Sequence, residues 1–202
     1  LLKSIDNNFS NRKHLVEKEI EFALARKDRA TQLVKLLKSK EIPLKVTHND
    51  TKLNNILFDK ATNKPVAVID LDTIMPGSIC YDFGDAIRFG CNPVAEDEKD
   101  LSKVNFDINL FEQFVKGYVF ALKDSITKSE VDALALGAYT MTYECGIRFL
   151  TDYLDGDKYF RIHREGQNLD RCRTQFKLVQ DMEEQFDKMN EIVQKYYNEY
   201  KN

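Results

Sequence analysis

Several patterns are scarce or missing in this sequence of 202 residues, and each absence excludes a class of protein. No apolar run approaches the roughly 18 residues that cross a bilayer, and no N-terminal stretch reads as a signal peptide. An excess of positive charge is also missing, since the formal net charge is −3, so electrostatics do not favour a nucleic-acid partner. The cysteines form no Cys-x-x-Cys pair, which indicates reduced thiols in a cytoplasmic protein.

Glycine is missing before Gly77, and the chain starts at Leu1 rather than at methionine. Tryptophan is absent altogether. What is present is ordinary for a globular protein, because 43% of the residues are hydrophobic and the charges nearly balance. Disorder is therefore excluded, and the length suits one good core or two small ones.

Helical periodicity covers most of the chain. Apolar residues recur at helical spacing from about Asn8 or Ser10 to Lys40, with a bend expected at residues 27–29 and an end at Pro43. Further helices are expected from residue 82 with Asp82 as cap, over 110–122, over 127–154 and over 169–197. The sequence therefore predicts a mostly helical domain of the α+β class.

A short β region interrupts the helices. Residues 44–47, 56–58 and 66–69 read as strands, and residues 59–65 as the turn between the last two. If these two strands form an antiparallel hairpin, Asn55 and Asp70 meet at its open end. Asp50, on the loop leading there, would join them.

An amide oxygen and one or two carboxylates around such a gap suit Mg²⁺, and a carboxylate not needed as a ligand can take a proton from an alcohol. That arrangement serves phosphoryl transfer. The alternative is structural, because a single Asp or Asn at a strand end is usually a turn former and His48 alone is usually a satisfied structural histidine.

The motifs themselves resemble a known family. They are His48-Asn49-Asp50-Thr51-Lys52-Leu53-Asn54-Asn55, Val68-Ile69-Asp70-Leu71-Asp72 and Asp82-Phe83-Gly84-Asp85. This combination is similar to the aminoglycoside phosphotransferase and choline kinase superfamily, and within it most resembles the N-acetylhexosamine 1-kinases. The resemblance implies a protein-kinase-like fold, ATP and Mg²⁺ as cofactors, and phosphorylation of the anomeric hydroxyl of a sugar such as GlcNAc or GalNAc.

The resemblance also implies roles for individual residues. Asp50 matches the catalytic aspartate at the acceptor hydroxyl, and His48 would brace the loop. Asn55 and Asp70 would be metal ligands. Asp72 could contact a second metal or the phosphates, or it could simply face solvent. Arg148, Phe89 and Tyr159 fall where sugar contacts are expected. An ion pair with Asp152 is an equally good interpretation of Arg148 from sequence alone.

Asp82-Phe83-Gly84 spells the metal-binding tripeptide of protein kinases, but it does not end the hairpin. We therefore expect Asp70 to hold the metal, and Asp82 and Asp85 to serve the start of a helix. Arg171 and Arg173 could contact an anion, although an ion-paired or solvated role is favoured.

Protein kinases need a glycine-rich flap and a strand lysine, and neither precedes His48. We therefore expect residues 1–202 to form the C-terminal lobe of a longer kinase, with the nucleotide lobe outside this chain and the fragment inactive alone. Alternatives within the enzyme class are a choline or ethanolamine kinase, disfavoured by the missing tryptophan and by Arg148, and an aminoglycoside kinase. A non-catalytic kinase-like binding module is the alternative from another class.

Overall fold

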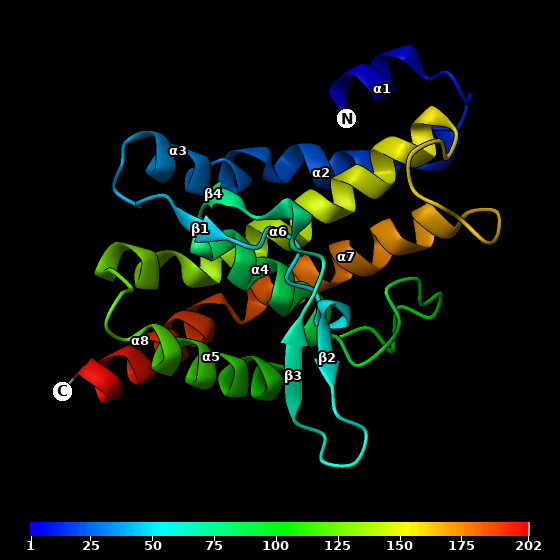
Figure 1. Ribbon diagram of the computed structural model, residues 1–202. Helices are drawn as coiled ribbons and strands as arrows, with labels where there is room; N and C mark the ends of the chain where they lie inside the picture. Colours follow the sequence, from blue (N-terminus) through cyan, green and yellow to red (C-terminus); the bar gives the residue numbers. More distant parts are fainter. Residues whose placement is uncertain (202) are drawn as a thin grey trace.

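The computed structural model describes residues 1–201 and contains eight α-helices in that range. They are α1 (Leu2–Asn7), α2 (Glu17–Ala30), α3 (Gln32–Lys38), α4 (Ile79–Gly90), α5 (Ile108–Leu122), α6 (Lys128–Asp155), α7 (Gln167–Glu184) and α8 (Phe186–Lys201). Short 3₁₀ turns lie at Lys13–Leu15, Leu53–Asn55 and Leu71–Thr73. The long helix α6 runs through the middle, with α2 and α3 along one side and α7, α8 and α5 along the other (Figure 1).

Two small antiparallel sheets complete the fold and confirm the α+β class. β1 (Lys45–Thr47) pairs with β4 (Met75–Gly77), and β2 (Ile56–Phe58) pairs with β3 (Pro65–Val68). The β2–β3 hairpin projects from the helices with its turn pointing away from them (Figure 1). The fourth strand was not predicted, because Pro76 at its centre lacks an N–H and weakens the strand pattern.

Helices α4 and α6 cross at close range because glycines face one another there. A Cβ on Gly84 would collide with the backbone carbonyl of Gly137, and a Cβ on Gly137 would collide with the carbonyl of Cys80. Phe83 beside this crossing is fully buried and packs edge-on against Phe111 at 5.9 Å between ring centroids. This crossing fixes α4, which carries the residues that face the β region.

The two ends of α6 lie where the sequence predicts them, whereas the predicted N-caps of α2 and α4 are wrong. Thr127 and Glu130 form the predicted capping box, and Gly156 ends α6 with φ of 92°. Asp82 does not cap α4, because Ser78 does so by accepting a hydrogen bond from the Cys80 N–H. Nor do Asn8 and Ser10 cap α2: Asn8 ends α1, and the Ser10 hydroxyl donates to the Leu154 carbonyl.

The predicted helix breaks are also displaced. Residues 27–29 stay helical and the bend falls at Thr31, between α2 and α3. The single helix expected over 169–197 is two helices that meet at Gln185, whose side chain donates to the Phe106 carbonyl. Neither break contains glycine or proline, so sequence pattern alone does not mark it.

Candidate active site

The loop after β1, residues 48–52, is held by one carboxylate from α4. Asp82 accepts hydrogen bonds from the backbone N–H groups of His48 and Asn49, each at 2.8 Å. Further bonds fix the loop from other sides: the Thr51 hydroxyl donates to the Asp82 carbonyl, and the Thr73 hydroxyl donates to the His48 carbonyl at 2.6 Å. We call residues 48–52 the polar loop.

Asn49 turns the polar loop sharply, with a left-handed φ of 64° that asparagine tolerates. Its side chain accepts from the Thr47 hydroxyl at 3.0 Å and donates to the Thr73 carbonyl at 3.0 Å. Gly77 on the facing strand leaves room for this arrangement, because a Cβ there would collide with the Thr47 hydroxyl and lie 3.0 Å from Asn49 Oδ1. The loop conformation therefore depends on both strands of the first sheet.

His48 joins the polar loop to the hairpin. Its Nε2 lies 2.9 Å from the Ile69 carbonyl, and its Nδ1 lies 3.3 Å from the Asp50 N–H. A carbonyl can only accept and an N–H can only donate, so Nε2 carries the proton. The ring thus links two backbone segments, which is the arrangement that a bracing role requires.

Asp50 lies at the open end of the hairpin together with Asn55. The Asn55 amide donates to the Asp50 carbonyl and to Asp50 Oδ2, both at 2.8 Å, and Lys52 Nζ lies 2.8 Å from the same carboxylate oxygen. Partial burial opposes ionisation, but the hydrogen bonds from Lys52 and Asn55 outweigh it and lower the pKa of Asp50. The carboxylate is therefore ionised at neutral pH and able to accept a proton.

Asp70 follows β3, and the residue before it pairs with Asn55, so the two strand ends meet as antiparallel geometry predicts. The Ile69 N–H donates to the Asn55 carbonyl at 2.9 Å, and Asp70 then adopts a left-handed φ of 64°. A hydrogen bond with the Asp72 carboxyl, together with burial and repulsion from Asp72 and Asp50, raises the pKa of Asp70. Asp72 and Asp50 are therefore close enough to Asp70 to oppose its ionisation.

This donor set fits a hard divalent cation. Asn55 Nδ2 is engaged by Asp50, which leaves Oδ1 as the acceptor of that amide. Asp70 and Asp72 add carboxylate oxygens whose mutual repulsion a cation would relieve. No group of three or more His, Cys, Asp or Glu side chains that could hold a metal occurs among residues 1–201, so a metal here would need the amide and water as additional ligands.

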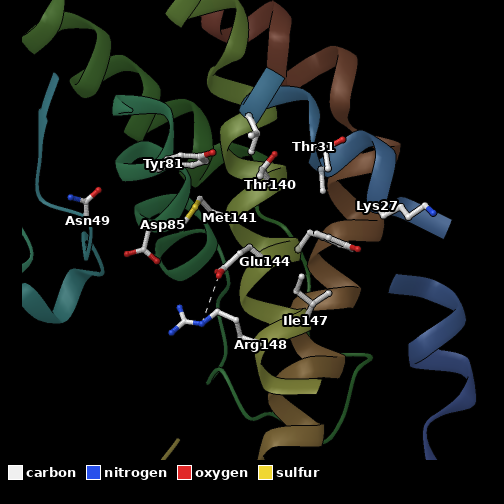
Figure 2. Close-up of a pocket in the computed structure, with 13 residues that line it drawn as sticks. Lys27, Thr31, Asn49, Tyr81, Asp85, Thr140, Met141, Glu144, Ile147 and Arg148 are labelled. Atoms are coloured by element: carbon white, nitrogen blue, oxygen red, sulfur yellow. Dashed lines mark ion pairs between the residues drawn. The ribbon is translucent and has the colours of Figure 1, made fainter. Parts of the chain in front are cut away.

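A cavity of about 520 Å³ opens beside Asn49, between α4, α6 and the α2–α3 junction (Figure 2). Arg148 lies at its rim on α6, with Nε 3.7 Å from Glu144 and a terminal nitrogen 3.4 Å from the Tyr159 hydroxyl. Arg148 and Tyr159 are therefore neighbours. Phe89 is not with them, since it lines a separate cavity with Arg88.

The alternative interpretation of Arg148, an ion pair with Asp152, is wrong, because Arg148 pairs with Glu144. The Asp152 carboxylate instead accepts from the backbone N–H groups of the loop after α6 and from the Asn168 amide at 2.9 Å. Arg171 and Arg173 are ion-paired, as expected, with Glu96 and Glu19 respectively.

Sequence reasoning missed three features of this site. Asp82 works from inside the first turn of α4 and holds the polar loop, rather than capping the helix. Lys52 pairs with Asp50, and Thr73 locks the loop backbone. Of these residues, only Lys52 could have been found from the sequence. It stands two residues after Asp50, and a cation so close to a carboxylate suggests an ion pair.

A braced loop carrying an ionised aspartate, beside an amide and two carboxylates at a hairpin end, defines a class of site suited to phosphoryl transfer. The comparison with protein families agrees. The model described as the phosphotransferase enzyme family (APH) matches residues 7–118, which is more than half of the chain. The chain belongs to this family.

The match covers the polar loop, the hairpin and α4. It therefore includes Asp50, Asn55 and Asp70. Arg148 and Tyr159 lie outside the matched range. No helix among the described residues is both long and apolar enough to cross a membrane.

Proposed function

We propose that this protein is part of an ATP-dependent kinase that phosphorylates the anomeric hydroxyl of an N-acetylhexosamine. The observation that carries the proposal is the open end of the β2–β3 hairpin, where Asp50 lies within hydrogen-bond distance of Asn55 and close to Asp70. Membership of the phosphotransferase enzyme family supports the reaction type. The resemblance of the motifs to the N-acetylhexosamine 1-kinases supports the acceptor.

In the proposed reaction the sugar oxygen forms a bond to the γ-phosphorus of ATP, the bond from that phosphorus to the ADP oxygen breaks, and the hydroxyl proton passes to Asp50. His48 and Asp82 keep the polar loop in place, so Asp50 is oriented before the acceptor arrives. Lys52, 2.8 Å from Asp50, provides positive charge beside the transferred group.

Asn55 and Asp70 would hold Mg²⁺, with Asp72 as a further oxygen donor. When bound, the metal neutralises negative charge on the phosphates. The grouping of two carboxylates and an oriented amide at the hairpin end supports this assignment.

We further propose that a nucleotide lobe outside residues 1–202 covers the β region. Apolar side chains that are at least one-third exposed cluster there: Leu44, Val46, Leu53, Leu57, Phe58, Val66, Val68, Ile69, Leu71, Ile74 and Met75. So many exposed apolar side chains within one short region favour an interface there. The described chain alone would then bind acceptor but turn over little ATP.

The cavity beside Asn49 also favours a neutral acceptor. Its charged lining residues are Lys27, Asp85, Glu144 and Arg148, two of each sign. A polycationic aminoglycoside would bind better in a pocket with net negative charge. A quaternary ammonium would bind better in an aromatic cage. This balance supports the sugar over the choline and aminoglycoside alternatives.

The test is an acceptor panel on the full-length natural protein, with ATP and Mg²⁺, measuring ADP release and the phosphorylated product. We expect turnover with GlcNAc or GalNAc, and Asp50→Asn should lower kcat by about 10²–10⁴-fold, the usual contribution of a general base. Asp59→Asn, at the closed end of the same hairpin, is the matched control and should keep kcat.

Phosphorylation of another alcohol with hexosamines ignored would contradict the sugar assignment and leave the phosphotransferase assignment standing. Nucleotide binding without turnover of any acceptor would favour the non-catalytic alternative.

A further inference from the structure

Glu144 on α6 is the acidic partner of Arg148, and both residues line the cavity of about 520 Å³. The Glu144 side chain is 42% exposed and the Arg148 side chain is 46% exposed, so a molecule in the cavity can reach both charged groups. Figure 2 shows the carboxylate and the guanidinium on the side of α6 that faces α4 and Asn49. Asn49 directly precedes Asp50 in the polar loop. The pair therefore faces the part of the protein where the reaction is proposed to occur.

The pair of Glu144 and Arg148 leaves most of its hydrogen-bonding capacity unused. Glu144 Oε1 lies 3.7 Å from Arg148 Nε, which is too far for a hydrogen bond, and the Glu144 carboxylate accepts none from the described residues. Arg148 makes one long hydrogen bond, at 3.4 Å to the Tyr159 hydroxyl. By contrast, Arg26 and Glu183 are hydrogen-bonded at 2.9 Å. The cavity thus has a charged acceptor and a charged donor that are not closed on each other.

The Glu144 carboxylate is also costly to keep charged. Burial against the cavity walls raises its pKa, which Arg148 and Arg88 oppose and the negative charge of Asp85 increases. A fully solvated surface ion pair would not show this shift. A carboxylate that opposes folding when charged, has no close partner and lies at a cavity is typical of a residue kept for binding.

We propose that Glu144 is a specificity-determining residue whose carboxylate accepts a hydrogen bond from a ring hydroxyl of the acceptor. This inference rests on the proposed function and deepens it, since it assigns a polar contact in the acceptor pocket. A hydroxyl both donates and accepts, so a sugar with neighbouring hydroxyls can donate to Glu144 and accept from Arg148 at once. A cation would be repelled by Arg148 and an anion by Glu144, so a neutral polyol suits the pair best.

The test compares two acidic residues on α6 in the full-length natural protein. Glu144→Ala should raise the Kd for GlcNAc or GalNAc about 10–100-fold, the value of a hydrogen bond to a charged group, and raise KM in parallel with little change in kcat. Asp132→Ala is the matched control, because Asp132 also pairs with a cation four residues away, Lys128, but does not line the cavity. It should leave Kd and KM unchanged.

Stability measurements separate lost binding from lost folding. Glu144→Ala should fold at least as stably as the unmodified protein, because alanine favours the helix and the substitution removes a charge that opposes folding. Glu144→Gln keeps an acceptor oxygen at the same place and should raise Kd less than Glu144→Ala. Thermal melts and sugar titrations of both variants check this, and an equal or larger rise in Kd for Glu144→Gln would contradict the contact.

Monodeoxy analogues of GlcNAc distinguish a direct contact from an effect through Arg148. One analogue should bind the unmodified protein and Glu144→Ala equally, because the hydroxyl that Glu144 contacts is already missing. The other analogues should still bind the variant more weakly. An equal loss with every analogue would mean that Glu144 acts only by positioning Arg148, and would overturn the inference.

Equal sugar affinity in the unmodified and Glu144→Ala proteins, with normal phosphorylation, would also overturn this inference and leave the proposed function intact. If the protein phosphorylates a different alcohol, the proposed function fails. Weaker binding of that alcohol to Glu144→Ala but not to Asp132→Ala would then still support the pocket assignment, and unchanged binding would overturn both.

Discussion

The helices and the β region obtain their order in different ways. The helical body (α2 and α4 to α8) surrounds a core of fully buried side chains such as Leu134, Leu150 and Met182. Within residues 44–77, all of which the structure describes, the buried side chains are two polar ones, Thr47 and Asn55. The β region is therefore fixed by hydrogen bonds to α4 and between its own strands, and not by a core of its own.

The residues that stabilise the fold and the residues proposed to act in the reaction therefore lie in different regions. The residues proposed to act on phosphate and acceptor lie where little apolar surface is buried, while the free energy of folding comes from elsewhere. Substitutions in the two regions should therefore give different signatures, and three pairs of variants test this.

The largest expected effect comes from core truncation. Leu150→Ala, in the C-terminal third of α6, should lower the free energy of unfolding by about 2–5 kcal/mol through lost burial and a cavity. Val68→Ala on β3, where the side chain is 55% exposed, should change it by less than about 0.5 kcal/mol. Urea unfolding followed by circular dichroism measures both. A cost for Val68→Ala comparable to that of Leu150→Ala would show that the β region has a packed core after all.

The second pair compares two carboxylates that each accept two backbone N–H groups. Asp82→Asn weakens the anchor of the polar loop and should lower kcat about 10–100-fold, because a small displacement of a reacting group is costly. Asp107→Asn weakens the cap of α5 in the helical body and should cost about 0.5–2 kcal/mol of stability with kcat unchanged. Steady-state kinetics and thermal melts on the full-length protein separate the two effects. An unchanged kcat in Asp82→Asn would mean that the loop does not need this anchor.

The smallest effects concern pH and have opposite signs in the two regions. Hydrogen bonds from Thr62 lower the pKa of Asp59 in the hairpin turn, so its stabilising contribution is present at neutral pH and is lost as pH falls through the folded pKa. Burial raises the pKa of Glu144 on α6, so its ionisation opposes folding as pH rises through the folded pKa.

Asp59→Asn should therefore lower Tm at pH 7, and Glu144→Gln should raise it, each by less than about 2 °C. The Glu144→Gln difference should vanish below about pH 4, where that carboxyl is protonated in the folded and unfolded states alike. The Asp59→Asn difference should shrink only at lower pH, because the pKa of folded Asp59 lies below its ordinary value. A Tm series from pH 3 to pH 8 checks this, and shifts of the same sign would contradict it.

The sequence predicts the hairpin and the capping box because their signals are local. Residues 59–65 carry turn formers between β-branched runs, and Thr127 and Glu130 stand at the spacing of a reciprocal cap. The meeting of the two strand ends that carry Asn55 and Asp70 followed from antiparallel geometry alone. These features depend on a few neighbouring residues.

The features that sequence reasoning missed all depend on tertiary contacts. Asp82 is a good cap by residue type, but α4 starts earlier, at Ile79 with Ser78 as its cap, because the chain leaves β4 at Gly77. The β1–β4 pair joins segments far apart in sequence, and Pro76 disguises one of them. The pairing of Arg148 with Glu144 rather than Asp152 follows from a loop whose N–H groups occupy Asp152. The spacing of apolar residues in the sequence does not show which of several partners a side chain will bind in the folded protein.

Helix α4 has a consequence for how the chain can vary in length. It carries Asp82, which holds the polar loop, and Asp85, which lines the cavity, three residues or about 4.5 Å apart along the helix axis. An insertion or deletion between them would rotate one away from its target by about 100°. Chain-length variation is therefore expected to be tolerated in the exposed turn at residues 59–64 and excluded between residues 82 and 85.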